Sequence, residues 1–71
     1  MQEIKIRGEM IRLGQLLKLG GVVESGADGK ELLATGAVLV NGEVETRRGR
    51  QLHDGDLIEV EEWEFRVSAD T

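Results

Sequence analysis

Three arginines within four positions, Arg47, Arg48 and Arg50, are the residues whose type and spacing point most directly to chemistry. Guanidinium groups that lie so close together repel one another unless they meet an anion, and the planar fork of arginine suits bidentate contact with phosphate. The residue pattern leaves two interpretations open. The cluster is either a solvated loop paired with Glu43 and Glu45, or a binding site for a phosphate-bearing partner.

The other reactive side chains give little support for an enzyme. The single histidine, His53, adjoins Asp54 in a predicted turn, which is more typical of an exposed loop residue than of a catalytic base. The chain has no cysteine, and its carboxylates show no metal-ligand spacing with the histidine. Trp63 and Phe65 alternate with acids, which favours core positions in a strand over stacking on bases. We therefore expect no catalytic residue, no cofactor and no metal.

The charge of the chain is negative overall but unevenly placed. Nine basic and 14 acidic side chains among 71 residues give a formal net charge of −5, which counts against a general polyanion binder. Acids crowd the last third of the chain, whereas three of the nine basic residues lie within 47–50. Because local potential governs contact, the acidity does not exclude a nucleic-acid site.

The length predicts a single small domain over residues 1–71. A membrane helix needs about 20 consecutive apolar residues, and this chain has no such run. Its first residues also lack the apolar region of a signal peptide. We therefore expect a soluble cytoplasmic protein.

Two helices and several strands are expected to position the basic residues. Residues 2–7 alternate, with Ile4 and Ile6 on one face, which predicts a strand. The helical spacing of apolar residues from Met10 onward predicts a first helix that ends at Gly20-Gly21. A second helix is predicted from the capping residue Ser25 to Gly36. Its expected buried residues are Ala27, Leu32, Leu33 and Ala34.

The rest of the chain has the pattern of a sheet. Strands are predicted at 38–40 and 44–46, joined at Asn41-Gly42, where positive φ angles suit a two-residue hairpin. Further strands are predicted at 57–60 and 63–67, and the tail from Ser68 to Thr71 is expected to fray. The predicted fold is α+β, with two packed helices against a small, mostly antiparallel sheet.

These residues resemble a known family. The pattern combines Arg12-Leu13, Leu16-Leu17, Ser25, Leu32-Leu33, Gly36, Val38-x-Val40-Asn41-Gly42 and Gly55-Asp56-x-Ile58-x-Val60. It resembles the S-four RNA-binding domain, or αL motif, over a core of about 10–60. Within that family the segments SGADGK and VNGEVETRRGR are most similar to short, stand-alone YbcJ-like bacterial members. Many members carry arginine directly after the helix-opening serine, where this chain has Gly26.

The resemblance implies RNA binding through the two helices and the adjoining loop, without catalysis. We expect structured ribosomal or transfer RNA as the ligand, bound mainly by shape and phosphate contacts. The alternative is a protein-interaction adaptor that offers the acidic C-terminal sheet face to a basic ribosomal or ribosome-assembly protein. The residues expected to contact RNA are Arg12, Lys18, Lys30, Arg47, Arg48 and Arg50.

Overall fold

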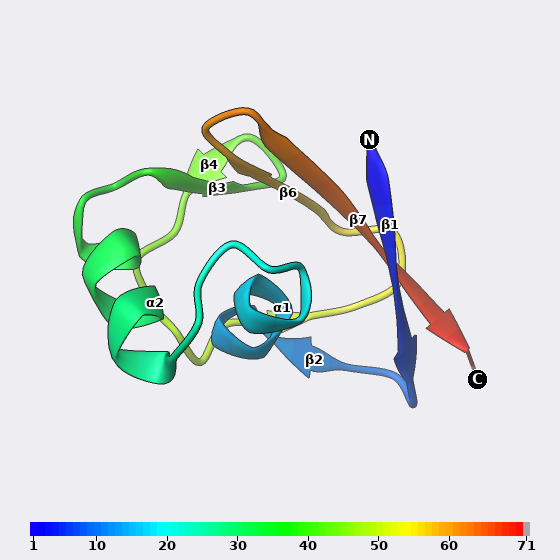
Figure 1. Ribbon diagram of the computed structural model, residues 1–71. Coiled ribbons are helices and arrows are strands. Elements are labelled where there is room, and N and C mark those ends of the chain that lie inside the picture. The colour runs from blue at the N-terminus through cyan, green and yellow to red at the C-terminus, as the bar shows by residue number, and fades with distance from the viewer. Residues whose placement is uncertain (71) are drawn as a thin grey trace.

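The computed structural model describes residues 1–70 and places two helices and seven strands among them (Figure 1). The helices are α1, Leu13–Leu19, and α2, Gly26–Ala34. The strands are β1 Gln2–Arg7, β2 Ile11–Arg12, β3 Val38–Val40, β4 Glu43–Val44, β5 Gln51–Leu52, β6 Leu57–Val60 and β7 Trp63–Asp70. The α+β fold expected from the sequence is confirmed.

Five of the strands form one mixed sheet in the order β1-β7-β6-β3-β4. Only β1 and β7 are parallel, whereas β7–β6, β6–β3 and β3–β4 are antiparallel neighbours. Strands β2 and β5 form a separate antiparallel pair. The sheet curves over the two helices, which cover one of its faces (Figure 1). The mostly antiparallel sheet and the packed helices therefore agree with the prediction.

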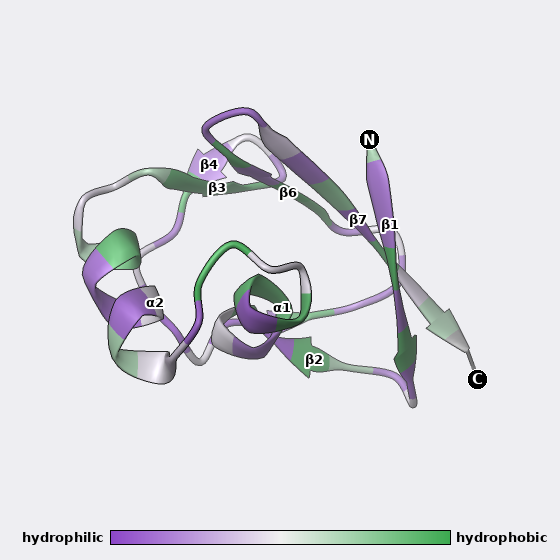
Figure 2. Ribbon diagram, viewed as in Figure 1, coloured by the Kyte–Doolittle hydropathy of each residue, from purple (hydrophilic) through white to green (hydrophobic). Residues whose placement is uncertain are grey.

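The hydrophobic core lies between the helices and the covered face of the sheet. Ile4 and Ile6 of β1 are buried, as their alternation predicts, and residues along β1 and β7 alternate between hydrophobic and hydrophilic (Figure 2). The core side chains without any exposed surface are Leu13, Leu16, Leu17, Leu33, Val38, Leu52, Ile58, Phe65 and Val67. Both layers thus contribute to one core.

Short-range signals place the ends of α2 and the hairpin that follows. The Ser25 hydroxyl accepts a hydrogen bond from the Asp28 N–H at 3.2 Å, which caps the start of α2. Gly36, with φ of +78°, follows its last turn. Asn41 and Gly42 both have positive φ, at 52° and 85°, as the two-residue hairpin requires. These three predictions are confirmed.

The start of the first helix differs from its prediction. Residues 11 and 12 form β2 and pair with Leu52 and Gln51, so α1 begins only at Leu13. Met10 is 36% exposed and does not belong to the apolar face of the helix. Long-range backbone pairing here overrides the helical spacing of the apolar residues.

The end of the chain also differs from its prediction. Residues 68–70 continue β7 and pair in parallel register with residues 5–7 of β1, so they are not frayed. Thr71 lies outside the described residues. Trp63 is 40% exposed, although Phe65, two positions further, is fully buried. The expectation that both aromatic rings lie in the core is therefore wrong for Trp63.

Smaller differences concern α2 and β4. Ala27 and Ala34 are exposed, and the buried face of α2 consists of Gly29 and Leu33 with half-buried Leu32. The strand expected at 44–46 is Glu43–Val44 instead. Within residues 1–70, neither helix is long and apolar enough to cross a lipid bilayer.

Candidate functional site

The loop that carries the three arginines follows β4 and is organised around a buried carboxylate. Glu45 is 7% exposed, and its backbone N–H donates to the Val38 carbonyl at 2.9 Å. Its side chain accepts hydrogen bonds from the backbone N–H groups of Thr46 and Arg47, both at 3.1 Å. These contacts fold the loop back beside β3 before the arginines begin.

Two of the three arginines are paired with this carboxylate. Arg47 donates from Nε and Nη2, at 3.1 and 3.0 Å, and Arg50 donates from Nη1 at 2.9 Å. The hydrogen bonds from Arg47, then from Arg50, lower the pKa of the Glu45 carboxyl to about 2. The carboxylate therefore stays charged and holds both guanidinium groups. The ion-paired interpretation of the cluster is correct for these two arginines, with Glu45 as the partner and not Glu43.

Arg48 lies apart from this network and packs on the start of α1. A Cβ placed on Gly14 would lie 2.5 Å from Arg48 Cγ, so only glycine leaves room for this side chain. The Gly14 N–H donates to the Arg48 carbonyl at 3.0 Å, and the Leu13 N–H donates to the Arg50 carbonyl at 2.9 Å. The arginine loop thus satisfies two first-turn amides of α1 and is held against that helix.

The Arg48 side chain passes over Gly14 of α1, and its guanidinium lies near Gly26 of α2. Its Nη1 lies 3.6 Å from the position that a Cβ on Gly26 would occupy. Gly26 is the residue directly after Ser25, where the resemblance described above includes an arginine in many members. In this chain the guanidinium of Arg48 therefore lies beside the position that follows Ser25.

Arg12 and Lys18 complete a groove with Arg48, which we call the basic groove. The basic groove has a volume of about 450 Å³ between α1, α2 and the arginine loop, and Gln15 and four glycines line the rest of it. Arg12 Nη1 donates to the Gly49 carbonyl at 3.1 Å, which fixes the rim of the loop. The lining contains three cations and no carboxylate. Such a groove is suited to a polyanion.

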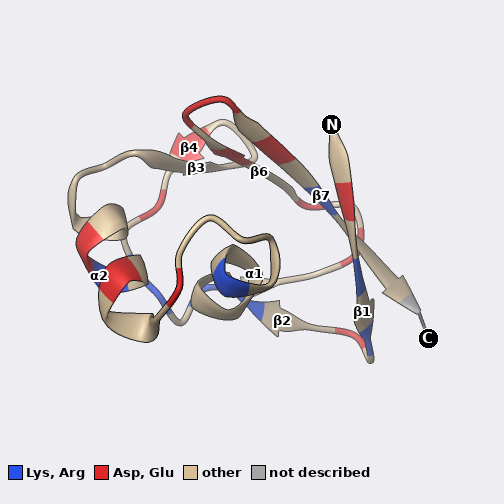
Figure 3. Cartoon of the chain, viewed as in Figure 1, with Lys and Arg blue, Asp and Glu red and all other residues tan. Residues whose placement is uncertain are grey.

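Of the remaining predicted residues, two lie next to the basic groove and one does not line it. Arg47 and Arg50 line an adjacent hollow with Gln51 and His53, and Gly49 belongs to both hollows. Lys30 is exposed on α2 and lines neither hollow, although it lies one helical turn from Gly26. In Figure 3 the basic segments of α1 and β2 lie in the lower part of the view, whereas the acidic turn between β6 and β7 lies at the top.

His53 and the carboxylates do not gather into a metal site within residues 1–70. No group of three or more His, Asp or Glu side chains there could hold a metal ion. His53 is exposed, and its backbone N–H donates to Asp56 at 2.8 Å, as in an ordinary turn. The sequence pattern suggests Glu45 as a partner of the arginines but does not predict its burial, because a glutamate in a polar run is usually solvated.

A protein-family model described as the S4 domain matches residues 4–68. The chain belongs to the S4 domain family. A similar relative is the "Probable ribosome maturation protein RlbA" of Bacillus subtilis (strain 168), which is 52% identical over 58 residues. That match covers 82% of this chain and 82% of the relative. The resemblance that the sequence shows to this family is thereby confirmed, and the basic groove is a feature of an S4 domain.

Proposed function

We propose that this S4 domain is a non-catalytic module that binds structured ribosomal or transfer RNA in the cytoplasm. The observation that carries this proposal is the basic groove, which presents Arg12, Lys18 and Arg48 together with no carboxylate among its lining residues. Membership of the S4 domain family supports an RNA ligand over other polyanions. The net charge of −5 does not oppose this function, since the acids lie outside the basic groove.

The six predicted residues have unequal roles in this proposal. Arg48 is central, because its guanidinium spans α1 and α2 and has no ion pair within the described residues. Arg12 and Lys18 contact phosphates from the α1 side of the basic groove. Arg47 and Arg50 form a second row whose charge is partly offset by Glu45. Lys30 adds a phosphate contact at the α2 rim.

The physical chemistry of the basic groove favours backbone and shape recognition. Its glycines, from α1, α2 and the loop, leave room for an RNA backbone to approach closely. A-form RNA is read largely through its phosphates and 2′-hydroxyls, because side chains cannot enter its deep major groove. Arginine is suited to such phosphate contacts through its planar fork. We therefore expect RNA structure to matter more than RNA sequence.

The name of the Bacillus relative supports a role in ribosome maturation. Its 52% identity to this chain makes a shared cellular process a reasonable expectation. We propose that the domain acts on ribosomal RNA during assembly of the ribosome, with ribosomal or ribosome-assembly proteins as its neighbours.

The experiment measures binding of the purified protein to ribosomal RNA, transfer RNA, a stem-loop and an unstructured single strand at several salt concentrations. The proposal predicts a preference for the structured RNAs. It also predicts that affinity falls steeply with salt, by about 0.9 log units for each phosphate contact on duplex when the salt concentration rises tenfold. Arg48→Glu should weaken binding roughly tenfold or more. A folded wild type that binds none of these RNAs at low salt would contradict the proposal.

The choice of Arg48 alone avoids a folding artefact. Replacing all three arginines of the loop would leave the buried Glu45 carboxylate without its side-chain partners, which is strongly destabilising. Arg48 takes no part in that network, so its replacement tests RNA contact without removing a partner of Glu45.

A further inference from the structure

A second groove, which we call the tryptophan groove, lies on a different face of α2. It has a volume of about 350 Å³ and is bounded by α2, by the connector that precedes it and by the turn between β6 and β7. Val23 comes from the connector, Leu32 from α2, and Val60 and Trp63 from the strands. Its floor is therefore apolar and is assembled from three separate parts of the chain.

Trp63 is the most exposed large side chain of this floor. It is 40% exposed, whereas Val60 beneath it in the hairpin is 1% exposed. Its ring stacks on Phe65 with centroids 5.8 Å apart and planes 14° apart, so one ring face is already packed. A half-exposed aromatic ring in a hollow has the character of an interface anchor.

The rim of the tryptophan groove is acidic. Asp28 and Glu31 of α2 and Glu61 of the β6–β7 turn line it, all three are exposed, and no cation is among the lining residues. Figure 3 shows acidic segments on α2 and in the turn between β6 and β7. Such a rim repels phosphate and attracts lysine or arginine. The open face of a tryptophan ring also attracts those cations.

We propose that the tryptophan groove binds a basic peptide segment of a protein partner, with an arginine or lysine against Trp63 and between the three carboxylates. An apolar side chain next to that cation would cover Leu32 and Val23. Charge complementarity selects this occupant over RNA, because each charged residue that lines the groove carries the same sign as phosphate.

The two grooves use different faces of the same helix. The basic groove meets α2 at Gly26 and Gly29, whereas Asp28, Glu31 and Leu32 line the tryptophan groove. Asp28, Glu31 and Leu32 follow helical spacing along one stripe of α2. RNA and a basic peptide can therefore be bound at the same time, and the domain would link them.

The fluorescence of Trp63 provides a local probe, because the chain contains no other tryptophan. The test ligand is an amidated peptide of alternating arginine and leucine. Two control peptides replace its arginines with glutamate or its leucines with glycine. We expect a saturable change of Trp63 emission with the first peptide, weaker binding of the glycine peptide and no response to the glutamate peptide.

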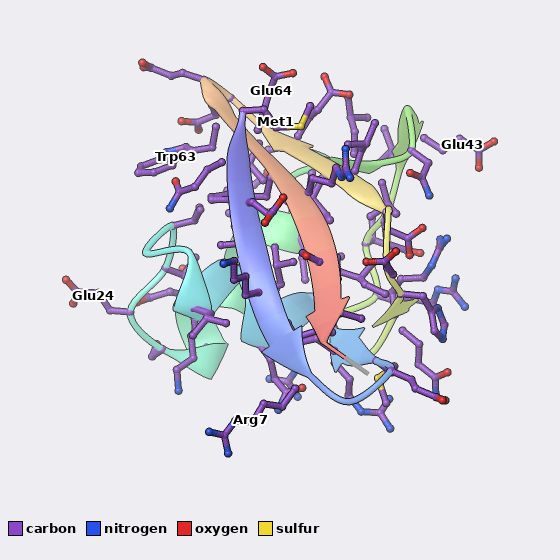
Figure 4. The ribbon with its side chains drawn as sticks, turned by 90° about the vertical axis from the view of Figure 1, so that its right-hand side faces the viewer. Met1, Arg7, Glu24, Glu43, Trp63 and Glu64 are labelled. Atoms are coloured by element: carbon purple, nitrogen blue, oxygen red, sulfur yellow. The ribbon has the colours of Figure 1, made fainter. Side chains whose placement is uncertain are left out.

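Charge-reversal variants distinguish peptide binding in the tryptophan groove from a general attraction of the peptide to an acidic protein. Glu31→Lys/Glu61→Lys should weaken peptide binding roughly tenfold or more. The matched control Glu59→Lys/Glu64→Lys removes the same charge from a cross-strand pair of β6 and β7 outside the groove. Neighbouring side chains of a strand point to opposite faces, and Trp63 and Glu64 leave β7 in different directions (Figure 4). Equal losses in the two double variants would overturn the proposal.

Glu61→Gly provides a variant that should not fail to fold. Glu61 has φ of 54°, a conformation that glycine adopts without strain. Thermal stability should therefore be kept, while peptide affinity falls several-fold. Unchanged affinity in this variant would contradict the proposed role of Glu61.

RNA binding distinguishes this inference from the proposed function. If Glu31→Lys/Glu61→Lys loses the peptide and keeps RNA, both proposals are supported. A wild type that binds RNA but not the arginine–leucine peptide overturns the peptide proposal alone. A response of Trp63 to a stem-loop RNA that Glu31→Lys/Glu61→Lys alters would assign the tryptophan groove to nucleic acid and would also overturn it.

Discussion

Arg48 occupies the space that any side chain at Gly14 would need, since a Cβ there would lie 2.5 Å from Arg48 Cγ. The two residues are also joined by the hydrogen bond from the Gly14 N–H to the Arg48 carbonyl. The first turn of α1 and the arginine loop are thus built to fit each other. This close approach directs the Arg48 guanidinium across the basic groove toward α2.

Gly14→Ala should therefore move Arg48 and weaken RNA binding about as much as Arg48→Ala does. Alanine favours a helix over glycine by about 1 kcal/mol, which offsets part of the cost of displacing the loop. We expect a small change of the free energy of unfolding, measured by urea denaturation, together with a loss of RNA affinity. Wild-type affinity in a folded Gly14→Ala variant would show that the position of Arg48 is unimportant.

The lowered pKa of Glu45 should make the stability of the protein depend on pH in the acidic range. Its pKa is lowered in the folded protein from the ordinary value of 4.5 to about 2, because Arg47 and Arg50 bind the charged form. A depressed folded pKa contributes stability that is present above about pH 4.5 and is lost as the pH falls toward about 2. Glu45→Gln cannot titrate, so its stability should fall less over this window.

Urea denaturation of the wild type and of Glu45→Gln between about pH 6 and about pH 2 measures this difference. The two stability curves should converge as the solution becomes more acidic. Curves that stay parallel throughout would mean that Glu45 does not have the depressed pKa that its contacts produce.

A substitution in the hairpin between β3 and β4 should change stability without changing RNA affinity. Gly42 has φ of +85°, and a side chain in this left-handed region costs about 1–2 kcal/mol, more for a β-branched residue. Gly42→Val should lower the free energy of unfolding by at least that amount. It should leave RNA affinity per folded molecule unchanged, because Gly42 lines neither the basic groove nor the adjacent hollow. A selective loss of RNA affinity with unchanged stability would place the hairpin at the interface.

The features that short-range physics determines could be predicted from the sequence. The alternation around Ile4 and Ile6, the Ser25 cap and the Asn41-Gly42 turn each depend on neighbouring residues, and each is confirmed. The family could be predicted as well, because its motifs occur in the expected order along the chain.

Features that depend on distant pairing could not be predicted in the same way. Strands β2 and β5 have two residues each, which is too short for a recognisable period, and they exist because they pair with each other. Residues 68–70 are ordered because β1 lies parallel to them. Trp63 is exposed because the hairpin ends beside α2 and leaves a groove there.

In the candidate site, too, side-chain contacts between distant residues could not be predicted from the sequence. The cluster of three arginines could be predicted as a site for an anion, but its division between two environments could not. Burial of Glu45 ties Arg47 and Arg50 to the protein, whereas the glycine at position 14 lets Arg48 reach the basic groove. Glu45 is buried where the loop folds back beside β3, and Arg48 is positioned where the loop packs on α1; the sequence pattern shows neither contact.

The most direct test of the central claim compares the salt dependence of RNA binding for two double variants of equal charge. Lys18→Ala/Arg48→Ala removes two cations that line the basic groove, whereas Lys5→Ala/Arg7→Ala removes two from β1, outside it. We predict that the first variant flattens the log–log salt slope by roughly 1.5 to 2 on structured RNA, and that the second leaves it unchanged. Equal changes in the two variants would contradict an RNA site in the basic groove.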